Sequence, residues 1–154
     1  MPTFTVVELA ARIAQRGEKP ELVADRIRNW TKDGLLEPAG DKNPGTGRSR
    51  RYPEKALIEA MVLLELMDCL GVQPIKARLY AGWFKAAKSA IEKNVQHKEF
   101  LVLSRGPDGG KITVVDTKAL NELPAVLQRS KFASHIIIDL GALYARLEQN
   151  PETA

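Results

Sequence analysis

The side chains of this sequence that could carry chemistry are mostly basic, and they fall in two short stretches of its first third. One stretch holds Arg26, Arg28, Asn29 and Lys32, and the other holds Arg48, Arg50 and Arg51. Such side chains are hydrogen-bond donors that can reach the phosphates and base edges of a nucleic acid. The two stretches are therefore candidates for binding double-stranded DNA, although a charge-rich helix surface is also commonly just a solvated face.

The charge distribution of the whole chain supports an anionic partner. The 154 residues carry a formal net charge of +4, from 23 basic and 19 acidic side chains. Residues 1–53 hold 10 basic and 7 acidic side chains, residues 54–75 hold 1 and 4, and residues 76–98 hold 6 and 1. Two basic stretches thus flank an acidic one, which favours nucleic acid ahead of a membrane surface as the partner.

Composition and motifs exclude several other classes. Cys69 is the single cysteine and only two histidines accompany it, so a zinc site of Cys and His ligands is excluded, and we expect Cys69 to be a small buried hydrophobe. The glycine-rich residues 106–110 precede Lys111, but Ile112 follows where a phosphate loop has Ser or Thr, which favours a hairpin turn. No catalytic triad, paired-carboxylate or dinucleotide signature appears. We therefore expect no enzyme, no cofactor and no metal.

The hydropathy pattern predicts a cytoplasmic protein. The longest apolar run spans residues 60–64 between two glutamates, far short of the ~20 residues that a membrane span needs. The N-terminus lacks the basic start and apolar core of a secretory signal.

The first third of the sequence predicts two short helices, a loop and a third helix. Thr5 and Glu8 form a capping box for a helix that Gly17 closes, and Pro20 begins a second helix that runs to Gly34. In the second helix Val23, Ile27 and Trp30 form the inner, core-facing stripe. With Val23 inward, a turn of 100° per residue puts Arg26 on the flank and five residues outward: Glu21, Asp25, Arg28, Asn29 and Lys32. Residues 37–53 are interpreted as a basic hairpin loop in which Tyr52 packs on the next helix, and a largely buried third helix follows from residue 53 to residue 70.

The remainder predicts a connecting helix and a small module of strands and helices. A helix from about residue 74 to residue 97 carries a stripe that is either a dimer seam or the face that packs on the rest of the chain: Tyr80, Phe84, Ile91 and Val95. Residues 100–103 and 112–115 form a hairpin, and Asp116 or Thr117 caps a short helix that Pro124 restarts. Residues 135–138 form a third strand, and Asp139 caps a last helix.

A helix, a tight turn, a second helix and a basic hairpin form the order of a winged helix-turn-helix. Short motifs in the first half of the chain strengthen that interpretation: Phe-Thr-Val-x-Glu-Leu-Ala from Phe4, Ile-Arg at Ile27, Asp-Gly-Leu-Leu from Asp33 and Arg-Arg-Tyr from Arg50. As an ordered set they resemble the DNA-binding domain of the MerR family of transcriptional regulators.

The resemblance implies a homodimer that reads a roughly palindromic DNA site with its second helix in the major groove. By matching position, Arg28 would be the recognition-helix arginine, and Arg50 and Arg51 the arginines of the wing. The sequence departs from the family at Asn29-Trp30, where an aromatic pair is usual, and at Thr31, where a glutamate is usual. It also has extra residues between the first two helices.

The sequence thus predicts an α+β, mainly α, protein in three parts. Residues 1–73 would be the MerR-like winged helix-turn-helix, residues 74–98 a connecting or dimerisation helix, and residues 99–154 a small α/β module of unknown role. We expect a sequence-specific transcriptional regulator that associates with the nucleoid, with RNA polymerase or an effector as further partners. Two alternatives remain: a DNA-architectural protein like excisionases or small terminase subunits, and an adaptor that acts through its C-terminal module.

Overall fold

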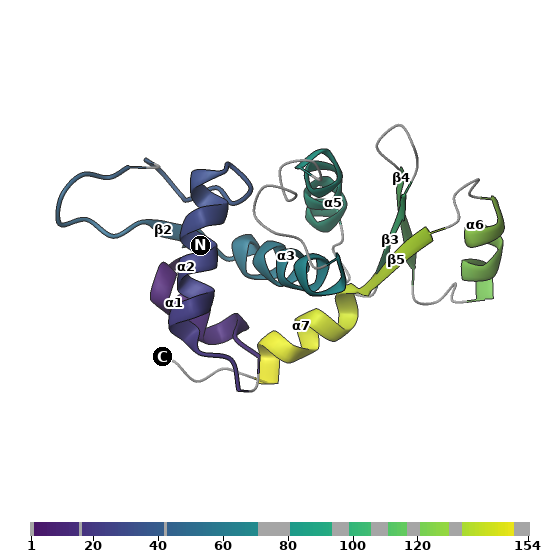
Figure 1. Ribbon diagram of the computed structural model, residues 1–154, viewed down its shortest axis with the longest axis horizontal. Coiled ribbons are helices and arrows are strands. Elements are labelled where there is room, and N and C mark those ends of the chain that lie inside the picture. The colour runs from purple at the N-terminus through teal and green to yellow at the C-terminus, as the bar shows by residue number, and fades with distance from the viewer. Residues whose placement is uncertain are drawn as a thin grey trace. The chain divides into compact units, whose positions relative to one another are not determined.

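The computed structural model describes residues 2–15, 17–41, 43–70, 81–93, 99–105, 111–116, 121–129 and 134–149 of the chain. In these residues the protein is mixed α+β and mostly helical, with two small antiparallel sheets (Figure 1). It divides into two compact units, Met1–Leu64 with Arg146–Ala154, and Glu65–Ala145. The expected boundary at residue 73 lies outside the described residues, as do the expected ends of the connecting helix.

The first unit begins with a short strand and a capped helix. β1 (Thr3–Thr5) leads into α1 (Val6–Ile13). The Glu8 N–H donates to Thr5 Oγ1 (3.2 Å), and the Thr5 N–H donates to Glu8 Oε2 (2.6 Å). The predicted capping box is confirmed, because both hydrogen bonds satisfy N–H groups that lack partners within the helix. The helix ends at Ile13, earlier than predicted, and Gly17 lies in the turn that follows.

α2 (Pro20–Lys32) has proline in its first turn, as predicted, and packs its apolar stripe on α1. Val23, Ile27 and Trp30 are buried together with Leu9 and Ile13 of α1, which confirms Trp30 as a core residue. The outward residues are exposed, as the helical periodicity predicted: Glu21, Asp25, Arg28, Asn29 and Lys32.

The end of α2 depends on Gly34, whose φ of +78° lies in the left-handed region. The Gly34 N–H donates to the Thr31 carbonyl (3.1 Å) and the Leu35 N–H to the Trp30 carbonyl (2.8 Å). This pair of bonds is a Schellman motif, in which glycine avoids the steric cost of a Cβ. Leu35 and Leu36 then enter the core.

Residues 37–41 and 43–50 form a loop that extends away from α1 and α2 (Figure 1). Its ends are joined where the Ala39 N–H donates to the Arg51 carbonyl (2.7 Å), in an isolated antiparallel bridge. β2 (Arg51–Pro53) then pairs with β1, with Phe4 opposite Tyr52. No pattern in the sequence predicted this two-stranded sheet, which connects the loop to the start of α1.

α3 (Lys55–Leu70) is buried on most of its sides, as predicted. Residues 56–64 are all buried, whereas a helix on a protein surface would keep one polar face exposed. Near its end Cys69 is exposed, so the prediction of a buried cysteine is wrong.

The second unit contains a three-stranded antiparallel sheet in the order β4-β3-β5. Its strands are β3 (Glu99–Arg105), β4 (Lys111–Asp116) and β5 (Ser134–Asp139), which confirms the predicted hairpin and third strand. α5 (Ala81–Lys93) packs against β3 and β4, and its Phe84, Ala87 and Ile91 are buried. The turn at residues 106–110, with its phosphate-loop alternative, lies outside the described residues, and so do Tyr80 and Val95.

Two further helices flank the third strand in the sequence. α6 (Leu123–Arg129) precedes β5, and α7 (Leu140–Gln149) follows it directly. The Ala142 N–H donates to Asp139 Oδ1 (2.9 Å), so Asp139 caps α7 as predicted. Among the helices of the described residues, none combines the length and the apolar character required to cross a membrane.

Candidate functional site

Three of the seven predicted binding residues line one hollow in the first unit. The hollow has a volume of about 600 Å³ and lies between α2, the start of α1 and the extended loop. It is lined by Thr5, Val6, Val7 and Arg28, and by loop residues 43–46 and 48–50. Arg28, Arg48 and Arg50 are its charged groups, and none of the described residues that line it is acidic. The hollow is therefore a cationic concavity, which attracts anions.

Arg28 lies on the outward face of α2 and is half exposed. Its Nη1 contacts Asp25 Oδ1, one turn earlier on the helix, and the Asp25 side chain is 66% exposed. An ion pair between two exposed side chains contributes at most about 1 kcal/mol, because water and salt screen it. Arg28 can therefore exchange Asp25 for another anion at little cost.

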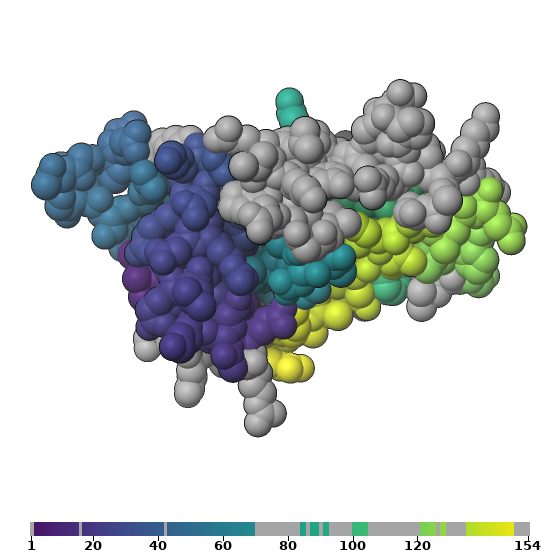
Figure 2. Space-filling model, in the orientation of Figure 1, coloured from purple at the N-terminus to yellow at the C-terminus, as the bar shows by residue number. Residues whose placement is uncertain are grey.

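The loop presents Arg48 and Arg50 on the other side of the hollow. Arg48 is exposed, and Arg50 donates from Nη2 to Asn43 Oδ1 (2.9 Å) across the loop. Gly45, with a φ of +86°, provides the turn between these residues, and the Arg48 N–H approaches its carbonyl at 3.5 Å. In Figure 2 the loop forms a lobe that projects from the first unit. The cationic side chains of the loop are therefore accessible to a large ligand.

Arg26 is held by the turn that precedes its helix. Its Nη1 donates to Glu18 Oε1 (2.7 Å), and the other oxygen of Glu18 accepts the Gln15 N–H (3.3 Å). Glu18 therefore connects the end of α1 to the flank of α2. Arg26 therefore joins α2 to the turn that follows α1, and it does not line the hollow.

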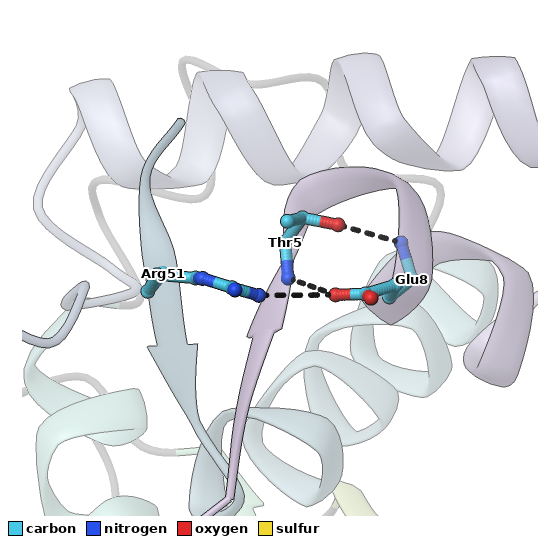
Figure 3. A network of polar contacts seen from close by, with 3 residues as sticks. All are labelled: Thr5, Glu8 and Arg51. Atoms are coloured by element: carbon cyan, nitrogen blue, oxygen red, sulfur yellow. Dashed lines mark hydrogen bonds and ion pairs between the residues drawn. The ribbon is translucent and has the colours of Figure 1, made fainter. Parts of the chain in front are cut away.

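Arg51 belongs to a different polar network, at the junction of β2 and α1. Figure 3 shows its guanidinium pointing across β1 to Glu8, whose Oε2 lies 3.5 Å from Arg51 Nη1. The same oxygen accepts the Thr5 N–H of the capping box. The hydrogen bonds from Thr5 are the main cause that lowers the pKa of Glu8 below its usual 4.5, and the charges of Arg51 and Arg12 lower it further.

A buried hydrogen bond joins α2 to the strand at the base of the loop. The Thr31 hydroxyl lies 2.8 Å from the Ile27 carbonyl and 2.7 Å from the Tyr52 hydroxyl, and both side chains are fully buried. Since the Thr31 hydroxyl has one proton, donation to Ile27 requires Tyr52 to be the donor in the second bond. Tyr52, which the sequence predicted to pack on the third helix, is fully buried, and its hydroxyl forms a hydrogen bond with Thr31 of α2.

The structure therefore brings together some of the predicted site residues and separates the others. Arg28, Arg48 and Arg50 share the hollow, whereas four predicted residues are not among its lining: Arg26, Asn29, Lys32 and Arg51. Asn29 and Lys32 are exposed on α2. Val7, which was not among the predicted site residues, also lines the hollow and is 64% exposed. The sequence gives no sign of this role, because an apolar residue in the first turn of α1 lines a hollow only where the loop lies beside it.

No group of three or more His, Cys, Asp or Glu side chains that could hold a metal occurs among the described residues. No protein-family model matches this chain, and a search of curated proteins finds no match to it either.

Proposed function

We propose that this protein is a sequence-specific double-stranded DNA-binding regulator whose first unit acts as a winged helix-turn-helix. The observation that carries the proposal is the cationic hollow between α2 and the projecting loop, with Arg28 on one wall and Arg48 and Arg50 on the other. A DNA strand is a polyanion that fits a concavity of this charge, and neutralising its phosphates releases counterions.

In this proposal α2 is the helix that enters the major groove. Its exposed residues Arg28, Asn29 and Lys32 are donors that reach base edges, and its buried stripe fixes their direction. The loop acts as the wing, and Arg48 and Arg50 contact the phosphate backbone beside the groove. This division follows the MerR-like pattern of the sequence, in which a homodimer binds two half-sites of a roughly palindromic site. Such a protein works in the cytoplasm on the nucleoid.

Selection of binding sites from a random duplex library, at near-physiological salt, tests the proposal. The purified full chain is expected to enrich an inverted repeat, whose two halves correspond to two subunits. The double variant Arg28→Ala/Arg48→Ala is expected to lose the enrichment. Lys85→Ala is the matched control, because Lys85 is an exposed cation on α5 in the second unit.

Two other results of the selection would contradict the proposal. Enrichment of duplexes without a shared motif would indicate the architectural role, in which the protein bends or coats DNA. Absence of binding even at low salt would indicate that the basic surface is incidental and that the protein acts as an adaptor through its second unit.

A further inference from the structure

The outer edge of β5 has the features of an unprotected edge strand, to which another strand could add. β5 pairs with β3 on one side only, and no other strand of the described residues pairs with it. A free sheet edge presents unpaired N–H and C=O groups, which natural proteins usually protect with lysine, proline or a bulge. The sequence of β5, Ser-His-Ile-Ile-Ile-Asp, has no lysine or proline, and its register with β3 is continuous from residue 134 to residue 139.

An apolar side chain at the centre of this strand is exposed. Ile137 has 43% of its surface accessible, and it is one of three exposed large hydrophobic residues in the described part of the chain. Its neighbours on either side, Ile136 and Ile138, are half-buried and buried. Contact with another strand would remove the Ile137 side chain from water and satisfy the edge hydrogen bonds together.

The sequence of β5 is complementary to itself when two copies run antiparallel about Ile137. In that register Ile137 faces Ile137 of the partner subunit, and Ile136 faces Ile138 of the partner subunit. His135, whose Nδ1 lies 2.9 Å from Ser104 Oγ, then takes the register position opposite Asp139 of the partner subunit, and the two-fold axis repeats this polar pair of positions at the other end. Apolar groups thus meet at the centre and polar groups at both ends, which is the pairing that stabilises adjacent strands.

We propose that β5 is a dimerisation strand, which pairs with β5 of a second copy to make a continuous six-stranded sheet. The pairing is isologous and closes after two copies, whereas β5 against β4 of another copy would continue indefinitely. The inference deepens the proposed function, since it identifies the surface that would hold two DNA-binding units together. It is tested without DNA, so its failure is distinguishable from failure of the DNA proposal.

The first test is the mass of the full chain in solution, by size exclusion with light scattering over a range of concentrations. The wild type is expected to form a dimer, and Ile137→Lys is expected to weaken dimerisation at least about tenfold, because it places two like charges opposite each other. Leu22→Lys is the matched control, since Leu22 is an exposed aliphatic residue of the first unit (55%) and its substitution is expected to leave the dimer intact. Circular dichroism checks that both variants remain folded.

The second test is a cysteine cross-link in a Cys69→Ser background, which removes the exposed native thiol. Directly opposite residues of an antiparallel pair have Cα atoms about 4.5 to 5.5 Å apart, within the range that a disulfide spans. Under mild oxidation Ile137→Cys is expected to give a covalent dimer on a non-reducing gel. Ser89→Cys, at an exposed position of α5, is expected to remain monomeric on the gel.

The proposal is overturned by a wild-type chain that is monomeric at all concentrations, or by a dimer that Ile137→Lys leaves unchanged. It is also overturned if Ser89→Cys cross-links as fast as Ile137→Cys. A mass that grows without limit as concentration rises would indicate pairing of β5 with β4 in place of the closed dimer.

Discussion

The arginines of the first unit differ in how firmly other groups of the protein already hold their guanidinium groups. Arg26 lies 2.7 Å from Glu18, and Arg51 lies 3.5 Å from a glutamate that also caps a helix. Arg48 and Arg28 line the hollow, and within the described part of the chain Arg28 pairs with an exposed aspartate, Asp25. Substitution of Arg26 or Arg51 therefore removes contacts within the fold. Substitution of Arg28 or Arg48 is expected mainly to weaken the binding of a ligand in the hollow.

Two alanine variants should separate base recognition from phosphate contact. Arg28→Ala is expected to weaken binding to the selected site by about 1–3 kcal/mol and to affect random DNA much less. Arg48→Ala is expected to weaken binding to both DNAs alike and to reduce the slope of log K against log salt by about 1. Fluorescence anisotropy with both duplexes over a range of salt measures both effects. Equal losses for the two variants on the two DNAs would contradict the assignment.

Glu8 makes a pH-dependent contribution to stability. Because the folded protein holds the pKa of Glu8 below 4.5, the ionised form stabilises the fold at pH values above 4.5, and this contribution is lost as the pH falls through the folded pKa. Glu8→Gln keeps a hydrogen-bond acceptor for the Thr5 N–H but removes the charge. It is expected to lower the melting temperature at neutral pH.

The measurement is thermal unfolding of the wild type and Glu8→Gln at neutral and at acidic pH. The difference between their melting temperatures is expected to shrink on acidification, since the wild-type carboxylate becomes protonated. A difference that stays constant with pH would mean that the charge of Glu8 does not stabilise the fold.

At the scale of elements, the hydroxyl pair of Thr31 and Tyr52 joins α2 to β2 and should show asymmetric mutational costs. Thr31→Val removes the acceptor of a fully buried phenol, which is expected to cost about 1–3 kcal/mol of unfolding free energy. Tyr52→Phe leaves the Thr31 hydroxyl bonded to the Ile27 carbonyl and is expected to cost about 0.5–1.5 kcal/mol.

A double-mutant cycle by denaturant unfolding measures the coupling between these side chains. The double variant is expected to lose less than the sum of the single variants, because it leaves no polar group of the pair buried without its partner. Additive costs would show that the two hydroxyl groups do not interact. A larger loss of unfolding free energy for Tyr52→Phe than for Thr31→Val would contradict the assignment of the Tyr52 hydroxyl as the donor and the Thr31 hydroxyl as the acceptor.

Local signals in the sequence predicted most of the elements, but they did not predict which distant elements meet. The capping box at Thr5, the proline at the start of α2 and the N-cap at Asp139 each act within four residues, so the sequence alone located those helix starts. β1 and β2 are three residues each and pair across 46 to 50 positions, and neither strand is long enough to give a periodic pattern. Cys69 was wrongly placed because residue type gives only a statistical preference for burial.

The candidate site was predictable in its residue types and only partly in its geometry. Periodicity about Val23 correctly placed Arg28 outward on α2. It did not reveal that Arg51 turns to Glu8 while Arg48 and Arg50 turn to the hollow, because that depends on the β1–β2 pairing.

At the scale of the whole molecule, the two proposals together make DNA binding bivalent. If β5 joins two copies, the second half-site is bound intramolecularly, which commonly raises avidity about 10²–10⁴-fold over a single site. Ile137→Lys is therefore expected to bind one half-site as the wild type does, but to reduce the preference for a complete palindrome at least about tenfold.

Gel-shift titrations of the wild type and Ile137→Lys against duplexes with one or two half-sites measure this preference. Ser89→Lys serves as the control, because it adds the same charge at an exposed position of α5, outside the proposed DNA-binding unit. An undiminished preference in Ile137→Lys would mean that the two copies are joined through another surface, and a loss of single-site binding would mean that Ile137 affects the first unit itself.

The anchoring of the projecting loop also has a consequence for how related chains can diverge. Both ends of the loop are fixed, one by the bridge between Ala39 and Arg51 and the other by the pairing of β2 with β1. Doubling the length of a flexible loop costs only about 0.6 kcal/mol in closure entropy. Insertions and deletions within residues 40–50 should therefore be tolerated during evolution. Related proteins with the same core are then expected to differ in the length of this loop while the packing of the core stays unchanged.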